Sequence, residues 1–597
     1  MIIIPRPQKM IVFDGIYNLG KGLVASEKNS EKVGKDALLL GIDIKVGNYG
    51  EENVFFYNDA TLKEEEYEIS VDVGGIKIIS ASAQGTFRAL STLKQILEQK
   101  EDNSIPFLKI NDYPDIPVRG IMLMAHSSCI YKMETVEYIV DRLAELKYNM
   151  LQLYFDTFVF EYDSFRKQLE GKMYYTKEEI RHLDAYCKER HIELMANVET
   201  FGHMSELLAC DEFAHLGITR DDGPKFSVNP ILEESFEVVA KILDDLLPNF
   251  SSGTVNIGMD ETYGLGEHET EEYCKTFGID GAYLDFLEKV SCYVKEKHGK
   301  RSMFWGDMAA KYPERMSEIS KDNIYVDWGY EPGHKFDRNA VACREAGLDF
   351  YVSPGTHQWG TITGRTDVMV QNIYFSAESG RHYGASGFLL TDWSINCTPS
   401  ITLLSITYGG AFSWNSGNSY SFSESHNEMD CLFRTSVSDD VLWYYDKFIA
   451  KSTGKSCAEI VYRMGNYWFM EQPKTNATWN GTILVKNFMS GDDEYSILNN
   501  SQLKRIKNYM MEIRKELDEC HFKAENGELI MKELTSACEL VIFAADSLMK
   551  KNSAEYDENE IDAEKLIENY RSLSDAHFCV QNEIGTVRAI KKWKGIS

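Results

Sequence analysis

The stretch RGIMLMAHSSCIYKMETVEYIVDRLAELKYNMLQLYFD (residues 119–156) contains one complete strand–helix–strand unit. Residues 120–124 and 150–154 are short apolar runs of the length typical of buried strands. Between them, residues 134–147 carry apolar side chains at helical spacing: Val136, Ile139, Val140, Leu143 and Leu146. Two parallel strands need a crossover connection, which is usually a helix. The stretch therefore predicts two parallel strands joined by a helix.

The same alternation of strand and helix continues to about residue 391. Thr176 and Glu179 form a capping box at the start of a further predicted helix, residues 177–190. The eight predicted strands are residues 120–124, 150–154, 193–197, 254–258, 302–306, 323–327, 349–353 and 387–391. Eight parallel strands with intervening helices over about 300 residues predict an α/β fold of the (β/α)8 TIM barrel type.

Two further regions flank the predicted barrel. In residues 1–112, a hairpin around Gly74 and Gly75 precedes a predicted helix at 83–97, which indicates a small α+β domain. Residues 425–597 carry two apolar helical stripes, which predict a helical domain: Leu503, Ile506, Met510, Ile513 and Leu517 in one, and Ile530, Leu534, Cys538 and Val541 in the other. The predicted domains are 1–112, the barrel at 113–424 and the helical region at 425–597.

Composition narrows the class of protein. The net charge of −30 argues against a nucleic-acid partner and against an anionic membrane surface. No apolar run approaches the roughly 18 residues of a membrane span, and only three consecutive aliphatic residues precede Pro5. The twelve cysteines lack CxxC spacing, which predicts neither a zinc site nor a disulfide framework. We expect a cytoplasmic protein with reduced thiols.

Asp260 and Glu261 are adjacent in TVNIGMDET, residues 254–262. Neighbouring strand residues point to opposite faces, but a strand end breaks this rule and lets both reach one pocket. Two close carboxylates do not ionise freely, and they separate into an acid and an anion. A random Asp–Glu pair is more often a solvated turn, so its surroundings decide between the two interpretations.

Further polar and aromatic residues follow the other predicted strands. The active sites of TIM barrels lie at the C-terminal ends of their strands, so these side chains should gather there. Trp305 taken alone fits a core residue, and His203 taken alone fits a structural histidine. Tryptophan rings offer apolar faces to a sugar, and carboxylates hold its hydroxyls, so the whole set predicts a carbohydrate site. The set is Asp156, Asn197, Glu199, His203, Trp305, Asp307, Asp327, Trp328, Tyr330, Trp359, Asp392 and Trp393.

The order of these motifs resembles that of the family 20 glycoside hydrolases, the β-N-acetylhexosaminidases. The resemblance covers roughly residues 1–420, and its most specific motif is NIGMDE at 256–261. The other shared motifs are IPRP at 4–7, RG at 119–120, LQLY at 151–154, FGH at 201–203, FWGD at 304–307, WGYE at 328–331, SPGT at 353–356 and TDW at 391–393.

The resemblance implies substrate-assisted catalysis, in which the sugar's own 2-acetamido oxygen attacks the anomeric carbon. It implies that Glu261 is the general acid, with a pKa raised by Asp260 and burial, and that Asp260 orients the acetamide. It implies no metal and no organic cofactor, and its partner is an oligosaccharide or glycoconjugate, with a homodimer as a further expectation. The expected substrate-binding residues are His203, Trp305, Asp307, Trp328, Tyr330, Trp359, Asp392 and Trp393.

The sequence departs from the family pattern where the far edge of the sugar should bind. Met124 and Ser127 replace an aspartate and an arginine after the first strand, and Ile395 replaces an acid after the last. Each lost hydrogen bond to a charged group is worth about 1.5–3 kcal/mol. The candidate replacements are His126, Ser128 and Asn396. Tyr330 and Tyr351 are the nearest candidates for the family's acetamide-binding tyrosine, whose place lies close to Trp359.

Three functions remain open from the sequence. The first is an exo-acting hydrolase that removes a β-linked N-acetylglucosamine or N-acetylgalactosamine, unsubstituted or substituted, from the non-reducing end of glycans. The second is a carbohydrate-binding homologue without catalysis, which the intact acid pair disfavours. The third is a barrel hydrolase acting on sugars without an acetamide, which the retained Asp260 disfavours.

Overall fold

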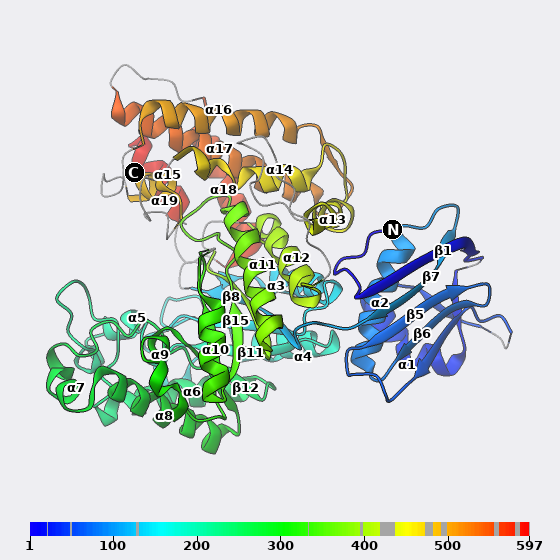
Figure 1. Ribbon diagram of the computed structural model, residues 1–597. Coiled ribbons are helices and arrows are strands. Elements are labelled where there is room, and N and C mark those ends of the chain that lie inside the picture. Colours follow the sequence, from blue (N-terminus) through cyan, green and yellow to red (C-terminus); the bar gives the residue numbers. More distant parts are fainter. Residues whose placement is uncertain are drawn as a thin grey trace.

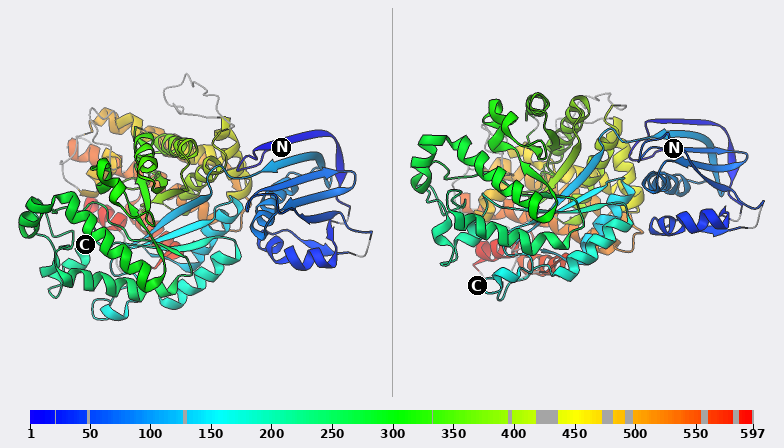
Figure 2. Two further views of the ribbon diagram at one scale, coloured as in Figure 1. Left: turned by 60° about the horizontal axis from the view of Figure 1, so that its bottom comes forward. Right: turned by 90° about the horizontal axis from the view of Figure 1, so that it is seen from below.

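The computed structural model consists of an N-terminal domain, a central barrel and a C-terminal helical region (Figure 1). It describes residues 1–20, 22–47, 50–126, 130–331, 333–394, 398–417, 436–471, 481–490, 498–553, 560–579 and 585–595. Both views of Figure 2 show the N-terminal domain at one side of the molecule and the C-terminal helices packed against the barrel. The predicted boundary between residues 424 and 425 lies outside the described residues.

The N-terminal domain has a five-stranded sheet in the order β1-β7-β5-β6-β4. The predicted hairpin is confirmed, because β5 and β6 pair antiparallel with Asp72 opposite Gly75. The predicted helix is α2, whose apolar face is buried against the sheet. The elements are β1 (Lys9–Asn18), β2 (Leu23–Ala25), α1 (Glu27–Leu39), β3 (Ile44–Val46), β4 (Val54–Asn58), β5 (Tyr67–Asp72), β6 (Gly75–Ser80), α2 (Ala83–Glu98) and β7 (Ser104–Asp112).

Eight parallel strands form a closed barrel, which confirms the predicted fold. Every predicted strand has a counterpart in the barrel. The strands are β8 (Val118–Ala125), β10 (Met150–Phe155), β11 (Glu193–Val198), β12 (Thr254–Asn256), β13 (Arg301–Trp305), β14 (Ile324–Trp328), β15 (Asp349–Ser353) and β16 (Gly387–Asp392).

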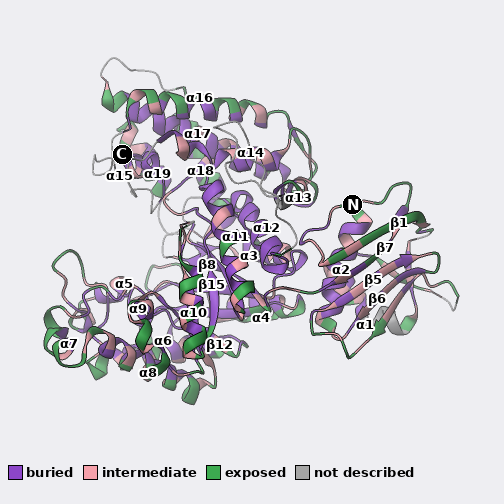
Figure 3. Cartoon of the chain, in the orientation of Figure 1, coloured by how far each residue is buried: buried purple, intermediate pink, exposed green. Residues whose placement is uncertain are grey.

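Helices surround the barrel, and their buried faces appear purple in Figure 3. The predicted capping box is confirmed, since Thr176 and Glu179 cap α4 reciprocally. The helices are α3 (Met133–Glu145), α4 (Lys177–Glu189), α5 (Ser205–Leu208), α6 (Glu233–Leu246), α7 (Glu271–Phe277), α8 (Ile279–His298), α9 (Asp307–Ala310), α10 (Phe336–Ala346), α11 (Thr366–Tyr383) and α12 (Pro399–Trp414).

The barrel interior is filled with side chains. Gln152 lies at its centre, where its amide nitrogen is 3.3 Å from the sulfurs of Met195 and Met303 and its oxygen accepts a hydrogen bond from Asn197. Methionine fills irregular gaps well, because its side chain is unbranched and flexible. A packed interior leaves the ends of the barrel as the places where a ligand can bind.

The foot of the barrel, meaning the N-terminal ends of its strands, is joined to the N-terminal domain by buried ion pairs. Arg119 donates to both oxygens of Glu65 at 2.7 Å, and Arg88 donates to the same carboxylate at 2.8 Å. Lys147 and Asp112 form a second buried pair at 2.8 Å. The arginine of the RG motif therefore fixes two domains together instead of lining a substrate site.

The C-terminal region is helical, and both predicted apolar stripes are buried, on α16 and α17. Its elements are α13 (Ser436–Tyr444), β17 (Ser452–Gly454), α14 (Cys457–Met464), α15 (Ile483–Ser490), α16 (Asn500–Leu517), β18 (Cys520–Phe522), α17 (Gly527–Asn552), α18 (Ala563–His577), β19 (Phe578–Cys579) and α19 (Gly585–Lys594). The strand β19 pairs with β9 (Ile130–Tyr131), which follows the first barrel strand. Of the helices described, none is long and apolar enough to cross a membrane. The cysteines in the described ranges are free thiols.

Candidate active site

The carboxylate pair lies on an irregular loop at the mouth of the barrel, meaning the C-terminal ends of its strands. The strand β12 ends at Asn256, so the prediction that the pair stands at a strand end is wrong by several residues. Met259 and Glu261 have positive φ angles of 80° and 46°. Non-glycine residues in this region store strain, and such strain is concentrated at functional sites. The left-handed turns, not a strand end, bring Asp260 and Glu261 to one point.

His203 joins the two acids. Its Nε2 atom lies 3.2 Å from Asp260 Oδ2 and 3.2 Å from Glu261 Oε2. Burial lowers the pKa of His203, but Asp260 and the hydrogen bond to Glu261 outweigh it and raise this pKa to about 12. The ring is therefore an imidazolium at neutral pH. Gly202 permits the approach, because a Cβ there would lie 2.2 Å from the carbonyl oxygen of Asp260.

Glu199 is a buried carboxyl group behind the pair. It is 3% exposed, and neither oxygen has a hydrogen bond of ordinary geometry, although Asp260 and Tyr154 lie beside it. Burial and the neighbouring Asp260 raise the pKa of Glu199 well above its usual value, which favours the neutral acid. Gly258 makes room for it, since a Cβ there would lie 2.1 Å from Glu199 Oε2.

Asp307 fixes the position of the loop that carries Asp260 and Glu261. It accepts a hydrogen bond from the backbone N–H of Glu261 at 3.2 Å and from the indole N–H of Trp328 at 3.3 Å. Burial, together with Asp260, raises the pKa of Asp307 to about 7. Asp307 thus connects the loop of Asp260 and Glu261 to Trp328, and its contact with a substrate stays a prediction.

Trp305 and Trp393 form adjoining aromatic surfaces inside the mouth. Trp305 is almost completely buried, and its ring centre lies 6.4 Å from that of Trp393. Tyr154 meets Trp393 edge to face at 4.9 Å. Trp305 belongs to the barrel interior, as the core interpretation expects, and it supports Trp393. Its contact with a sugar stays a prediction.

The aromatic wall continues through Tyr330. The two candidates for the acetamide-binding tyrosine, Tyr330 and Tyr351, lie at different ends of the barrel. Trp393 Nε1 donates to the hydroxyl of Tyr330 at 2.8 Å, and Tyr330 contacts Trp328 and Trp359 at 5.3 and 4.8 Å between ring centres. Burial raises the pKa of Tyr330, and Asp260 and Glu261 contribute in the same direction. Tyr351 instead packs against Gly387 at the start of β16. Tyr330 lies at the mouth and Tyr351 at the foot.

Two aspartates at strand ends do not face the pair. Asp392 is buried, accepts a hydrogen bond from Thr356 Oγ1 at 2.8 Å, and has a pKa raised to about 7 by burial. Asp327 points to the outside of the barrel, where it contacts His334 at 3.0 Å and Asn339 at 2.8 Å. Side chains alternate along a strand, so Asp327 faces a helix while Trp328 faces the mouth.

The sequence did not single out Phe226 and Tyr263. Phe226 lies against His203 with ring centres 4.6 Å apart, and Tyr263 lies 5.2 Å from Phe226. Burial and a hydrogen bond to Glu261 raise the pKa of the Tyr263 hydroxyl. Both belong to loops without periodicity, so the only available signal was the closeness of Tyr263 to the Asp–Glu motif.

The structure describes only some of the residues at which the sequence departs from the family pattern. Met124 lies in the barrel interior and is almost buried. His126 Nε2 is 3.4 Å from Asp156 Oδ2 at the ends of neighbouring strands. Ser127, Ser128, Ile395 and Asn396 lie outside the described residues.

The three charged groups at the centre also have the spacing of a metal site. Among the described residues, the ligand atoms of His203, Asp260 and Glu261 all lie within 4.8 Å of one another. A metal would need neutral imidazole, since ligands bind in their deprotonated form. Without a metal, Asp260 and Glu261 raise the pKa of His203, which favours a proton on the ring. The absence of a metal stays a prediction.

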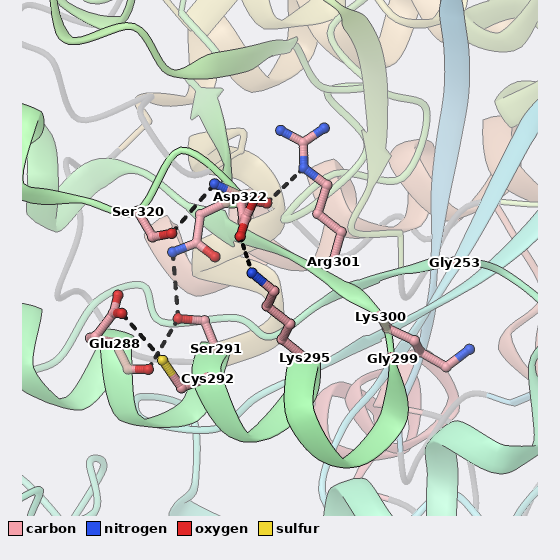
Figure 4. Close-up of a pocket in the computed structure, with 11 residues that line it drawn as sticks. Gly253, Glu288, Ser291, Cys292, Lys295, Gly299, Lys300, Arg301, Ser320 and Asp322 are labelled. Carbon is pink, nitrogen blue, oxygen red and sulfur yellow. Dashed lines mark hydrogen bonds and ion pairs between the residues drawn. The ribbon is translucent and has the colours of Figure 1, made fainter.

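A separate hollow lies at the foot of the barrel, on α8 and the strand beside it (Figure 4). Its volume is about 340 Å³. Lys295 pairs with Asp322, and Arg301 pairs with Asp349 at 2.6 Å. None of the predicted site residues lines this hollow. The predicted site residues lie at the mouth, which is therefore the candidate active site.

Comparison with known proteins agrees with this location. The pattern of Glycosyl hydrolase family 20, domain 2, matches residues 1–113, and that of the Glycosyl hydrolase family 20 catalytic domain matches residues 117–359. The chain is 23% identical over 399 residues to a β-hexosaminidase of Vibrio furnissii, covering 59% of this chain and 63% of that protein. It is 25% identical over 357 residues to a β-hexosaminidase of Porphyromonas gingivalis, covering 53% of this chain and 44% of that protein. The chain thus spans less than two thirds of these relatives.

Solved structures share the fold. A chitobiase of Flavobacterium johnsoniae has a TM-score of 0.61 at 19% identity, and the similarity covers 99% of this chain and 98% of that one. An exo-β-N-acetylglucosaminidase of Vibrio harveyi has a TM-score of 0.55 at 20% identity, covering 69% of this chain and 73% of that one. The two family patterns together span more than half of the sequence, in the domains that carry the carboxylate pair and its supports. The chain belongs to glycosyl hydrolase family 20.

Proposed function

We propose that the protein is an exo-acting β-N-acetylhexosaminidase that retains the anomeric configuration through substrate-assisted catalysis. The observation that carries this proposal is the geometry of Asp260 and Glu261, both 3.2 Å from His203 Nε2 at the mouth of the barrel. The names of the relatives, β-hexosaminidase and chitobiase, support the same substrate class.

In the first step, the acetamide oxygen of the sugar forms a bond to the anomeric carbon while the glycosidic bond breaks. Glu261 gives its proton to the departing oxygen, and the product is a bound oxazolinium ion. Asp260 accepts a hydrogen bond from the acetamide N–H and stabilises the positive charge that develops on this group. In the second step, Glu261 takes a proton from water as the water oxygen attacks the anomeric carbon. The bond between that carbon and the acetamide oxygen breaks, which opens the oxazolinium ring. The hydroxyl of Tyr330 is the donor best placed to hold the acetamide oxygen.

His203 contributes a positive charge to both acids. The ring lies 3.2 Å from one carboxylate oxygen of each acid, so it helps to hold Asp260 turned toward the acetamide. Since a histidine contacts both acids, it also fixes their separation through the proton transfers at Glu261.

The substrate is a terminal N-acetylglucosamine or N-acetylgalactosamine, with or without substitution on its far hydroxyls. Met124 presents an apolar surface in the barrel where an acid stands in the family pattern. A sugar with a substituent on the hydroxyl next to Met124 would meet an apolar side chain at this position instead of an acid.

The test is a set of nitrophenyl glycosides assayed with the wild type and Glu261→Gln. We expect turnover of at least one 2-acetamido sugar, and a loss of about 10²–10⁴-fold in the variant, the usual contribution of a general acid. Plain β-glucosides and β-galactosides should be cleaved far more slowly. Equal rates with and without the acetamide would indicate the non-acetamido hydrolase. Binding without turnover, and without any effect of the substitution, would indicate the binding homologue.

A further inference from the structure

We propose that the C-terminal helical region determines which hexosamine is accepted, because it fixes the rim segment, residues 354–365 between β15 and α11. This inference rests on the proposed function and extends it to substrate specificity. The family patterns match only up to residue 359, so the C-terminal region has no role assigned by them.

The rim segment forms part of the aromatic wall. It carries Trp359, whose ring packs 4.8 Å from Tyr330 and 4.9 Å from His357. Tyr330 in turn accepts the hydrogen bond of Trp393. Gly355 lies under this cluster, since a Cβ there would be 2.8 Å from the Trp359 ring and 2.9 Å from that of Tyr330. A shift of the rim segment would therefore move the surfaces that contact the sugar.

The C-terminal region touches the rim segment backbone to backbone beside Trp359. The N–H of Thr482 donates to the carbonyl of Gly360 at 3.0 Å. Gly481 has a φ of 105°, and a Cβ at this residue would lie 2.1 Å from the same carbonyl oxygen. Only glycine fits this contact without a displacement.

A second contact holds the other end of the rim segment. The hydroxyl of Thr363 donates to the carbonyl of Met464 at 2.9 Å, and the N–H of Thr366 donates to that of Gly465 at 3.2 Å. A Cβ at Gly465 would lie 1.9 Å from Thr366 Oγ1. The rim segment is therefore held at two places by close contacts with the C-terminal region.

Arg365 connects these contacts to the mouth. It is almost completely buried, and its guanidinium lies 6.0 Å from the ring centre of Trp468 in the C-terminal region. On its other side, Nη2 lies 2.7 Å from Glu331 Oε1 and 3.1 Å from His357 Nδ1. Glu331 is the neighbour of Tyr330. One buried cation thus joins the C-terminal region to both loops that carry the aromatic wall.

The same region also reaches the other side of the mouth. The strand β19 pairs with β9, and the N–H of Lys132 donates to the carbonyl of His577 at 2.8 Å. Strand β9 comes soon after β8, which carries Met124. The C-terminal region therefore contacts the barrel at the rim segment and also just after the strand that carries Met124, where one recognition motif departs from the family pattern. This second contact favours a role in specificity.

The test compares Gly481→Ala with the matched control Gly585→Ala. A Cβ at Gly481 meets the carbonyl of Gly360, whereas a Cβ at Gly585 has nothing within 4 Å. The readout is the ratio of kcat/KM for nitrophenyl N-acetyl-β-glucosaminide to that for the galactosaminide, two substrates that differ only at C4. We expect Gly481→Ala to lower kcat/KM by about 10–100-fold and to change the ratio by about tenfold, chiefly through KM. Gly585→Ala should leave both unchanged.

Trp468→Leu provides a second variant in case Gly481→Ala does not fold, and it should change the ratio in the same way. The inference would be overturned if the wild type is active and both variants fold but leave the ratio unchanged. A wild type without turnover would count against the proposed function alone, and calorimetric titration with N-acetylglucosamine would then decide the inference. It stands if Gly481→Ala weakens binding and Gly585→Ala does not, and it falls if both bind like the wild type or if the wild type does not bind.

Discussion

The two ends of the barrel treat buried charge in opposite ways. At the foot, Glu65 is held by two arginines and Asp112 by a lysine, all of them buried. At the mouth, both oxygens of Glu199 and one oxygen of Asp260 are buried without a hydrogen bond of ordinary geometry. Buried polar atoms without a hydrogen bond are costly, so a protein keeps them only where the surrounding fold imposes them.

The difference separates stability from function. The paired charges at the foot join the N-terminal domain to the barrel, and each carboxylate there has a cationic partner. The strained loop and the crowded acids at the mouth make the groups there respond to a ligand that supplies the missing partners. Variants at the foot should therefore change the free energy of unfolding and spare catalysis, whereas variants at the mouth should change catalysis most.

The largest effect is expected from Glu65→Ala. It leaves Arg88 and Arg119 buried without their carboxylate, and the unfolding free energy should fall by about 3–5 kcal/mol. Urea denaturation measures this change, and kcat should stay near the wild-type value. Glu189→Ala, which removes the partner of Lys35 in an exposed ion pair, is the control and should not change stability measurably. A catalytic loss in Glu65→Ala at full stability would break the comparison.

Asp260→Asn should have the next largest effect, and this effect should be on catalysis more than on stability. The change keeps the shape of the side chain but removes the anion that stabilises the positive intermediate. We expect kcat to fall by about 10²–10³-fold, as when one preorganised electrostatic contact is lost. The unfolding free energy should fall by less than in Glu65→Ala, because Glu261 still lies 3.2 Å from His203 in the variant's unchanged surroundings. A variant that unfolds more easily and keeps its kcat would contradict the assignment.

The pH dependence of stability tests the charge of His203. Its pKa is raised to about 12 in the folded state, so its contribution is complete below its ordinary pKa of about 6.5. That contribution is lost as pH rises toward 12, by at most about 1.4 kcal/mol per pH unit. The stability difference between the wild type and His203→Gln should therefore shrink between about pH 7 and pH 9. A constant difference would show that the ring is neutral.

The smallest effect on stability is expected from Glu199→Gln. Burial raises the pKa of Glu199, so its contribution is present at low pH and is lost as pH rises through the raised value. Glutamine resembles the neutral acid, so at about pH 4 the unfolding free energy should change by less than about 1 kcal/mol. As the pH rises above about 4.3, the unfolded carboxyl of the wild type ionises, and the variant should become the more stable protein. Strong destabilisation at all pH values would place Glu199 with the paired charges of the foot.

Most of the architecture could be predicted from local pattern. Apolar runs such as residues 349–353 have the same bounds as β15, and Thr176 with Glu179 caps its helix as expected. These features depend on residues close in sequence, so periodicity and capping chemistry are sufficient to find them. The gathering of the acids and tryptophans at one end follows from the barrel itself.

The sequence by itself determined the barrel, its two flanking regions and the identity of the acid pair. The tertiary structure decided what periodicity cannot contain: the positive φ angles that aim Asp260 and Glu261 together, and the positions of Tyr330 at the mouth and Tyr351 at the foot. It also decided the contact of Gly481 with Gly360, which joins residues far apart in the chain. Such features depend on which backbone passes beside which, and that is fixed only when the distant segments pack.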